Sequence, residues 1–458
     1  MADPRTAALS YAHQNSQVFL DYLKDLVRIP SVSTSSDHAK AMKDAAENLA
    51  NRLRGLGFTN VALHPTGGHP VVFGEYIVNQ SDRKTVLIYG HYDVQPAEPL
   101  DLWKTPPFEP TEIDGNLFGR GASDMKGQVA ASLAAVEAVL QAGEPPVNIK
   151  FMIEGEEEIG SPNLAPFLQA NAAMLAADVV LNPDAGMLAA DFPTLTYALR
   201  GLAYFELRVY GPEHDLHSGL FGGVVHNPAQ ALIELIAGMH DADGRIQLPG
   251  YYDSVREMSA EERADIARLP MSEDFYKAQT GAPQLWGEKG FTPAERIGGR
   301  PTLEVNGLLS GFTGKGSKTV IPSWAMAKIS MRLVPDQDPD EVHRQLVQYL
   351  EQKAPKTIRW ELTKMAGGPA SFTNPNHPAA VAMSQAMETI WGMRPVFKRE
   401  GGSIPIVAEM QEILGVESVL TGFGLPEDNV HAPNERLHLP TWYRGIDALI
   451  HFFYNYGK

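Results

Sequence analysis

Short apolar segments alternate with helical segments along the first 200 residues, and no other feature of the sequence constrains the fold as strongly. The apolar segments are rich in β-branched residues and have the length of strands. Strands that alternate with helices form a mostly parallel sheet with helices on both faces, so we expect an α/β fold here. The expected strands are 70–77, 85–89, 148–153 and 178–182, and the clearest helices are 39–56 and 127–142.

The pattern changes near Gly201. Residues 202–211, LAYFELRVYG, alternate between apolar and polar side chains, which is typical of a sheet with one face in solvent. Residues 241–300 are rich in proline, glycine and charge, and we expect an irregular insertion there. The other segments are a helix at 227–239, strands at 302–309, 324–334 and 357–364, and a helix at 338–353. They predict an α+β domain inserted into the first one, with domain limits of 1–200, 201–370 and 371–458.

Composition excludes several kinds of partner and site. The chain has 458 residues, enough for two or three domains, and a formal net charge of −17, which argues against a nucleic-acid partner. It contains no cysteine, so any metal must be held by His, Asp and Glu. There is no signal-peptide pattern and no apolar run long enough to span a membrane. We therefore expect a cytoplasmic protein with no membrane partner.

Polar side chains follow the apolar strands at the point where each strand is expected to end. Ligands bind outside the carboxyl ends of the strands in open parallel sheets, so these side chains are expected to meet at one rim. Imidazole and carboxylate groups are the ligands that a two-metal hydrolase needs. The sequence therefore predicts a metal site built from five segments. These contribute His91 and Asp93, Asp124, Glu157 and Glu158, Asp184, and His431.

One of these segments, IEGEEEIGS at 153–161, crowds four glutamates into five positions directly after a strand. Like charges at one strand end repel each other, so the run is either solvated or faces positive charge. An acidic run alone is more often a solvated surface. Two divalent cations at the rim would remove the repulsion, and the other polar residues at neighbouring strand ends favour that interpretation.

Eight motifs, in order along the chain, resemble those of the cocatalytic zinc metallopeptidases, a family of acylases, carboxypeptidases and dipeptidases. The similarity is greatest to the branch of cytosolic nonspecific dipeptidase and carnosine dipeptidase, and it extends over nearly the whole chain. It implies a zinc-peptidase-like catalytic domain with an inserted lid and dimerisation domain. The motifs are GHYDVQP, GRGASDMKG, EGEEEIGS, DLHSGLFGG, KTVIP, SMRLVP, EGGSIP and DNVHAPNE.

The resemblance implies a role for each metal ligand. His91 and Asp184 would bind one divalent ion, Glu158 and His431 would bind a second, and Asp124 would bridge both. Zinc is the expected metal, with manganese or cobalt as alternatives.

The same resemblance implies two catalytic carboxylates. Asp93 is similar to the carboxylate that orients the imidazole of His91. Glu157 is similar to the general base, which accepts a proton from the water that forms a metal-bridging hydroxide and passes it to the leaving amine. The family also carries a cis peptide after its bridging aspartate, so a cis bond is expected between Asp124 and Met125.

The inserted domain is expected to contribute substrate contacts. His217, in DLHSGLFGG, resembles a lid histidine that stabilises the oxyanion in the active site of the other subunit, which implies a homodimer. Arg332 resembles the arginine that binds the C-terminal carboxylate of the substrate. Thr319, His377 and Ser403 match further substrate contacts in the dipeptidase branch.

The predicted function is hydrolysis of dipeptides or short peptides with a free C-terminal carboxylate. An N-acyl amino-acid deacylase of the same family is a second hypothesis, because the metal core is shared and only the substrate pocket differs. A non-catalytic, peptide-binding homologue is a third, and the complete ligand set together with Glu157 argues against it. A serine hydrolase is disfavoured because no G-x-S-x-G motif has a strand–turn–helix setting.

Overall fold

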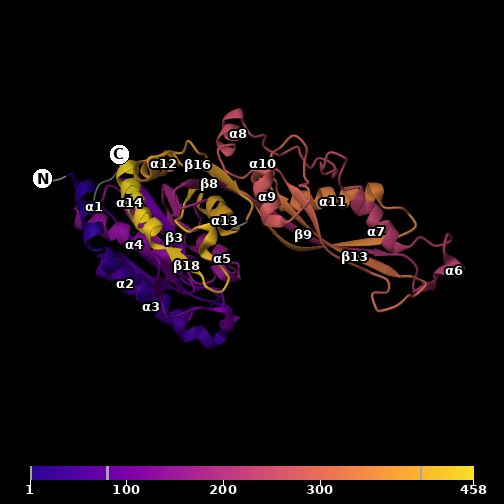
Figure 1. Ribbon diagram of the computed structural model, residues 1–458, viewed down its shortest axis with the longest axis horizontal. Helices are drawn as coiled ribbons and strands as arrows, with labels where there is room; N and C mark the ends of the chain where they lie inside the picture. The colour runs from indigo at the N-terminus through magenta and orange to yellow at the C-terminus, as the bar shows by residue number, and fades with distance from the viewer. Residues whose placement is uncertain (1–2, 79–81, 403–404) are drawn as a thin grey trace. The chain divides into compact units, whose positions relative to one another are not determined.

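The computed structural model describes residues 3–78, 82–402 and 405–458, and the chain divides into two compact units (Figure 1). The first unit comprises Met1–Tyr197, Thr373–Phe397 and Glu409–Lys458. The second comprises Ala198–Phe372 and Lys398–Ala408. Among the described residues, no helix has the length and apolar character needed to cross a membrane.

The larger sheet, most of whose strands belong to the first unit, has a parallel centre and antiparallel edges. Its strand order is β1-β2-β6-β3-β7-β17-β8-β15, with β16 paired to β8. β3 is parallel to both β6 and β7, and β17 is parallel to β7. The predicted α/β class is therefore confirmed. The strands are β1 (Thr59–His64), β2 (Val71–Tyr76), β3 (Thr85–His91), β6 (Asn148–Glu154), β7 (Val179–Asn182), β8 (Thr194–Leu199), β15 (Ser371–Phe372), β16 (Val396–Glu400) and β17 (Ser418–Leu420).

Helices cover both faces of this sheet. On one face, Leu53 of α3 packs over Gly74. The side chain of the preceding residue, Phe73, points to the opposite face. There its ring lies beside that of His64, and Phe167 of α5 packs on the same histidine. The Ala-rich α4 is buried along most of its length, because α1, α2 and α14 enclose it (Figure 1). The helices are α1 (Pro4–Gln14), α2 (Ser16–Val27), α3 (Ala39–Gly55), α4 (Lys126–Gln141), α5 (Leu164–Leu175), α12 (Pro378–Trp391), α13 (Pro405–Leu414) and α14 (Leu439–Tyr456).

A glycine lets α4 approach the central strand β3. A β-carbon at Gly90 would lie 2.8 Å from the Cγ2 atom of Val129 on α4, closer than packed carbons approach. Gly90 immediately precedes His91, so this close packing fixes the strand end that carries a predicted ligand. A small antiparallel sheet of β4 (Thr111–Ile113), β5 (Asn116–Phe118) and β18 (Arg436–His438) completes the first unit.

The second unit is built on an antiparallel sheet in the order β11-β13-β9-β14. One face packs on α7 and α11, and β9 alternates between buried and more exposed side chains, as the sequence predicts. Residues 241–300 contain three short helices rather than only irregular chain. The elements are β9 (Gly201–Tyr210), β10 (Leu216–His217), α6 (Ser218–Phe221), α7 (Pro228–Ala237), α8 (Ala260–Ile266), α9 (Glu273–Thr280), α10 (Pro293–Gly299), β11 (Thr302–Ser310), β12 (Val320–Ile321), β13 (Trp324–Leu333), α11 (Pro339–Lys353) and β14 (Arg359–Gly368).

Candidate metal centre

The carboxyl ends of the central strands bring the predicted ligands together in the first unit. His91 is the last residue of β3, and Asp184 lies just after β7. Asp124 is in the loop before α4, Glu158 is in the 3-10 turn after β6, and His431 is in the loop after β17. Segments more than 300 residues apart in sequence thus meet at one rim, as expected for an open parallel sheet.

These five side chains form two groups that share Asp124. In the first group, Nε2 of His91 lies 3.1 Å from Oδ1 of Asp124 and 3.9 Å from Oδ1 of Asp184. In the second, Nε2 of His431 lies 2.9 Å from Oδ2 of Asp124 and 3.1 Å from Oε2 of Glu158. Each carboxylate oxygen of Asp124 therefore faces a different histidine.

Both groups have the donor types and the spacing that a divalent metal requires. The ligand atoms within each group all lie within 4.8 Å of one another. Ligands about 2.1 Å from a tetrahedral ion lie about 3.4 Å apart, close to the distances observed here. Asp124 has one oxygen available to each group, which is the arrangement of a bridging ligand.

Electrostatics at the rim also fit a cation. The pKa of Glu157 is raised to about 7, mainly by burial and also by the negative charges of Asp124 and Glu158, against the opposing effect of His91. Burial likewise raises the pKa of Asp184 well above its ordinary value. Protein groups alone thus leave these carboxylates poorly stabilised as anions, and positive charge between them would remove the penalty.

The histidines respond to the same carboxylates. Hydrogen bonds to Asp124 and Glu158 raise the pKa of His431 to about 10. Burial alone would lower the pKa of His91, but its contacts with Asp124 and Asp93 raise it well above the usual value.

Asp93 has two structural contacts at the site. Its backbone carbonyl lies 3.0 Å from Nδ1 of His91, and its carboxylate lies 3.4 Å from the same atom. The carboxylate also accepts hydrogen bonds from the backbone N–H groups of Glu157 and Glu158, at 3.2 and 3.1 Å. Asp93 therefore connects the imidazole to the acidic turn, a connection that the sequence did not reveal.

The other two acids of the IEGEEEIGS run are hydrogen-bonded and buried, not solvated. Glu154 accepts hydrogen bonds from Tyr89 at 2.8 Å and from Ser161 at 2.9 Å. Glu156 accepts from the side-chain amide of Asn163 at 2.9 Å. Both glutamates are less than a tenth exposed, so they help to fold the turn that carries Glu157 and Glu158.

Two residues of the quoted motifs hold the site together and were not singled out from the sequence. The side-chain amide of Gln95 donates to Oε2 of Glu158 at 2.8 Å. The buried carboxylate of Glu435 accepts hydrogen bonds from Arg120 and from three backbone N–H groups, including that of Asp124 at 3.1 Å. A Glu four residues after a predicted His ligand was the only available sequence signal. The peptide bond between Asp124 and Met125 is cis, as predicted.

The predicted substrate residues lie in several places. His217 and Thr319 are neighbours in the second unit, because β10 pairs with β12 and the N–H of Ser218 donates to the Thr319 carbonyl at 3.1 Å. Both side chains are exposed. His377 caps the N-terminus of α12 in the first unit, where its Nδ1 accepts from the N–H of Ala379 at 3.3 Å. Ser403 lies outside the described residues.

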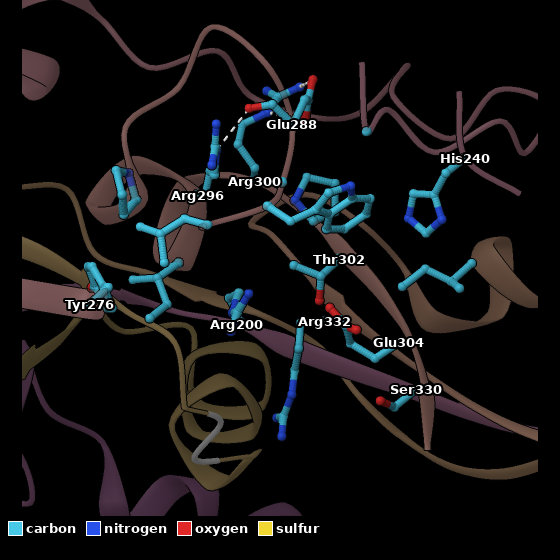
Figure 2. A pocket seen from close by; sticks show the side chains of 18 of the residues that line it. Arg200, His240, Tyr276, Glu288, Arg296, Arg300, Thr302, Glu304, Ser330 and Arg332 are labelled. Carbon is cyan, nitrogen blue, oxygen red and sulfur yellow. Dashed lines mark hydrogen bonds and ion pairs between the residues drawn. The ribbon is translucent and has the colours of Figure 1, made fainter. Parts of the chain in front are cut away.

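Arg332 lies on β13 and lines a cavity of about 490 Å³ that is formed entirely by the second unit (Figure 2). The cavity also contains Arg200, Glu304 and residues of the 241–300 segment. Cationic and apolar side chains line it together.

Comparisons with known proteins agree with this geometry. The model of the peptidase family M20/M25/M40 matches residues 87–455. The Cys-Gly metallodipeptidase DUG1 of Candida albicans is 33% identical over 465 residues, which cover 96% of this chain and 95% of that protein.

Two solved structures extend the comparison to the fold. An M20 family metallo-carboxypeptidase from Sulfolobus solfataricus has a TM-score of 0.80 and 34% identity, covering 96% of this chain and 99% of that one. Human carnosine dipeptidase 1 has a TM-score of 0.75 and 30% identity, covering 99% of both chains. Every ligand predicted above lies inside the matched range.

Proposed function

The chain belongs to the peptidase family M20/M25/M40, and from this we propose that it is a metal-dependent dipeptidase. Its substrates would be dipeptides or short peptides with a free C-terminal carboxylate. The observation that carries the proposal is the pair of ligand groups that share Asp124. Asp124, His91 and Asp184 would hold one divalent ion, and Asp124, Glu158 and His431 the other.

Bound divalent ions lower the pKa of a water molecule and polarise the scissile carbonyl. Side chains of the protein then accept and donate the proton. Glu157 projects from the turn that Asp93 holds, and it would accept the proton of the attacking water and return it to the leaving amine. Asp93 would keep the imidazole of His91 oriented. Zinc is the proposed metal, because imidazole and carboxylate ligands suit it, although such sites also accept manganese and cobalt.

Substrate contacts would come from the residues that the family resemblance indicates. Arg332 would bind the C-terminal carboxylate with its two-pronged guanidinium group. His217 would stabilise the oxyanion in the site of a second subunit, and Thr319 beside it would contact the same substrate. We propose a homodimer formed by the inserted domain, because His217 could act in trans only in such an assembly. A catalytically competent monomer in light scattering would contradict this arrangement. A cytoplasmic location stays a prediction, tested by fractionating the source cells.

The decisive experiment couples metal analysis to a substrate panel. The purified protein should contain about two divalent ions per chain and should cleave dipeptides faster than N-acetyl or N-succinyl amino acids. Faster cleavage of the N-acyl compounds would instead identify a deacylase. Fewer than about one ion per chain and no cleavage would support the non-catalytic alternative.

A further inference from the structure

His431 is the most exposed of the five predicted metal ligands. Its side chain is 52% exposed, whereas those of the other four ligands are between 0% and 18% exposed. It lies in the loop after β17, and its φ of 63° is in the left-handed region that residues with a β-carbon rarely adopt. Little packing surrounds this histidine, so its position depends on how neighbouring residues hold the loop.

The side chain of Asn434 joins this loop to segment 95–104 of the chain. Its Oδ1 accepts from the backbone N–H of Lys104 at 2.7 Å, and its Nδ2 donates to the carbonyl of Leu102 at 2.8 Å. One partner is a donor and the other an acceptor, so only one orientation of the amide satisfies both. Asn434 thus fixes the loop, three residues after His431, to a separate part of the first unit.

The other end of segment 95–104 holds the second ligand of the same group. Nε2 of Gln95 donates to Oε2 of Glu158 at 2.8 Å and to the backbone carbonyl of Glu158 at 3.2 Å. The same Oε2 lies 3.1 Å from Nε2 of His431. A carboxylate oxygen has two lone pairs, so it can accept from Gln95 and still bind an ion. Segment 95–104 is therefore bonded to Glu158 at one end and to the loop of His431 at the other.

Buried contacts hold segment 95–104 itself in place. Arg120 is 1% exposed, its Nη2 donates to the carbonyl of Pro96 at 3.1 Å, and its guanidinium lies 5.3 Å from the centre of the Trp103 ring. Nε1 of Trp103 donates to the carbonyl of Ala97 at 2.7 Å. Arg120 also donates to Glu435, the residue after Asn434, at 2.8 Å. The segment is a fixed support rather than a free loop.

The ligands of the other group are positioned by the sheet. His91 ends β3, and Asp184 follows β7, which pairs with β3. Nδ1 of His91 lies 3.0 Å from the carbonyl of Asp93, and the N–H of Asp184 donates to the side chain of Asn182, the last residue of β7, at 2.9 Å. The two groups share Asp124 but have different supports, so a change in segment 95–104 should affect only one of them.

Resting on the proposed dipeptidase function, we propose that Gln95 and Asn434 are positioning residues for one of the two metal positions, that of Asp124, Glu158 and His431. Through segment 95–104 they hold Glu158 and His431 at the spacing that this ion needs. Loss of either side-chain amide weakens this position selectively, while the position of His91 and Asp184 keeps its affinity.

Competition with a chelating dye, using zinc and then cobalt, measures the two dissociation constants of the protein. Gln95→Ala and Asn434→Gly should each raise one constant by about 10- to 100-fold, the usual effect of losing a group that orients a ligand, and leave the other within about threefold. Glycine is chosen because the φ of Asn434 is 63°, which glycine adopts without strain, so the change isolates the side-chain bonds. Both side chains are partly exposed, so both variants should fold.

A double substitution identifies the position that is weakened. In a His431→Ala background, where this position has already lost a ligand, Asn434→Gly should have no further effect on metal binding. In an Asp184→Asn background it should still weaken the other ion. A further loss of metal in the first background, with none in the second, would overturn the assignment.

Asn429→Gly is the matched control. Asn429 lies in the same loop with a φ of 53°, but its side chain donates only to the carbonyl of Asn434, at 3.4 Å. Both constants should stay within about threefold of wild type. An equal effect of Asn429→Gly and Asn434→Gly, or equal weakening of both positions by Gln95→Ala, would overturn the inference and leave the dipeptidase function intact. A wild type that binds fewer than about one ion and cleaves no dipeptide would overturn both.

Discussion

The four glutamates of the IEGEEEIGS run have different environments although they are almost adjacent. Glu154 and Glu156 are buried and accept hydrogen bonds, whereas Glu158 contacts His431 and Glu157 lies where the charges of Asp124 and His91 shift its pKa. The sequence could predict that some of the run faces cations, because the other ligands follow neighbouring strands. It could not predict the burial of Glu154, since its partner Tyr89 comes from a different strand and an acid alone gives no sign of such a partner.

Glu157→Gln should reduce kcat by about 100- to 10,000-fold and leave metal content unchanged. The amide cannot accept a proton from water, and this is the usual range for loss of a general base. Kinetics and metal analysis of the same preparation check the prediction. Glu158→Gln is the comparison, because it should lower metal content. Loss of metal from the Glu157 variant would assign this residue to metal binding.

Glu435→Gln should weaken metal binding by about 10- to 100-fold. The carboxylate holds the loop that carries Asp124, and an amide would place an N–H group against backbone N–H donors. Chelator competition and the visible spectrum of the cobalt-substituted protein measure the change. Glu137→Gln is the matched control, because Glu137 is also a buried carboxylate bonded to an arginine, Arg52, but is remote from the ligands. Equal metal affinity in the two variants would contradict this role of Glu435.

In the metal-free protein, ionisation of Glu154 should lower the free energy of unfolding as pH rises from about 4.5 to 8. Burial raises the pKa of this carboxyl from 4.5 to about 8 in the folded state. Within that window the folded protein keeps a proton that the unfolded chain has lost, so unfolding becomes easier as pH increases. The change is at most about 1.4 kcal/mol per pH unit. Urea unfolding across this range should show that Glu154→Gln gains stability relative to wild type as pH rises. Parallel pH curves would refute the effect.

The longer elements of both units could be predicted from the sequence, whereas the short ones could not. The period-two alternation of β9 and the apolar runs of β3 and β6 are strong patterns. The two-residue strands β10 and β12 are too short to have a period, and they form only because each pairs with the other. The helices within 241–300 have seven or eight residues and begin at capping serines or threonines that polar loops also contain.

Close packing between α4 and β3 gives a prediction about these elements. Gly90→Ala should destabilise the protein by about 1–3 kcal/mol, because the new methyl group would overlap the side chain of Val129. Chemical denaturation measures the loss. Gly55→Ala is the control, since a β-carbon there meets no atom within 4 Å and the stability should change by less than about 1 kcal/mol. Equal effects of the two substitutions would show that the close approach is unimportant.

At the scale of the whole molecule, each unit has its own hydrophobic core, and the proposed metal ligands all belong to the first. Removal of metal should therefore lower the thermal midpoint of one unit and leave that of the other unchanged. A ligand at 100 times its Kd stabilises the state that binds it by about 2.7 kcal/mol. Differential scanning calorimetry with and without chelator should resolve the two responses. An equal shift in the thermal midpoints of both units would contradict the prediction that only one unit binds metal.

The division of the chain has one more consequence. The polypeptide passes between the two units after Tyr197, Phe372, Phe397 and Ala408. Neither unit is one continuous segment of the chain. Neither can therefore be expressed as a single uninterrupted fragment or fused as such to another protein. A protease that nicks one connection still leaves three covalent links between the halves. We therefore expect a nicked molecule to migrate as one species until it is denatured.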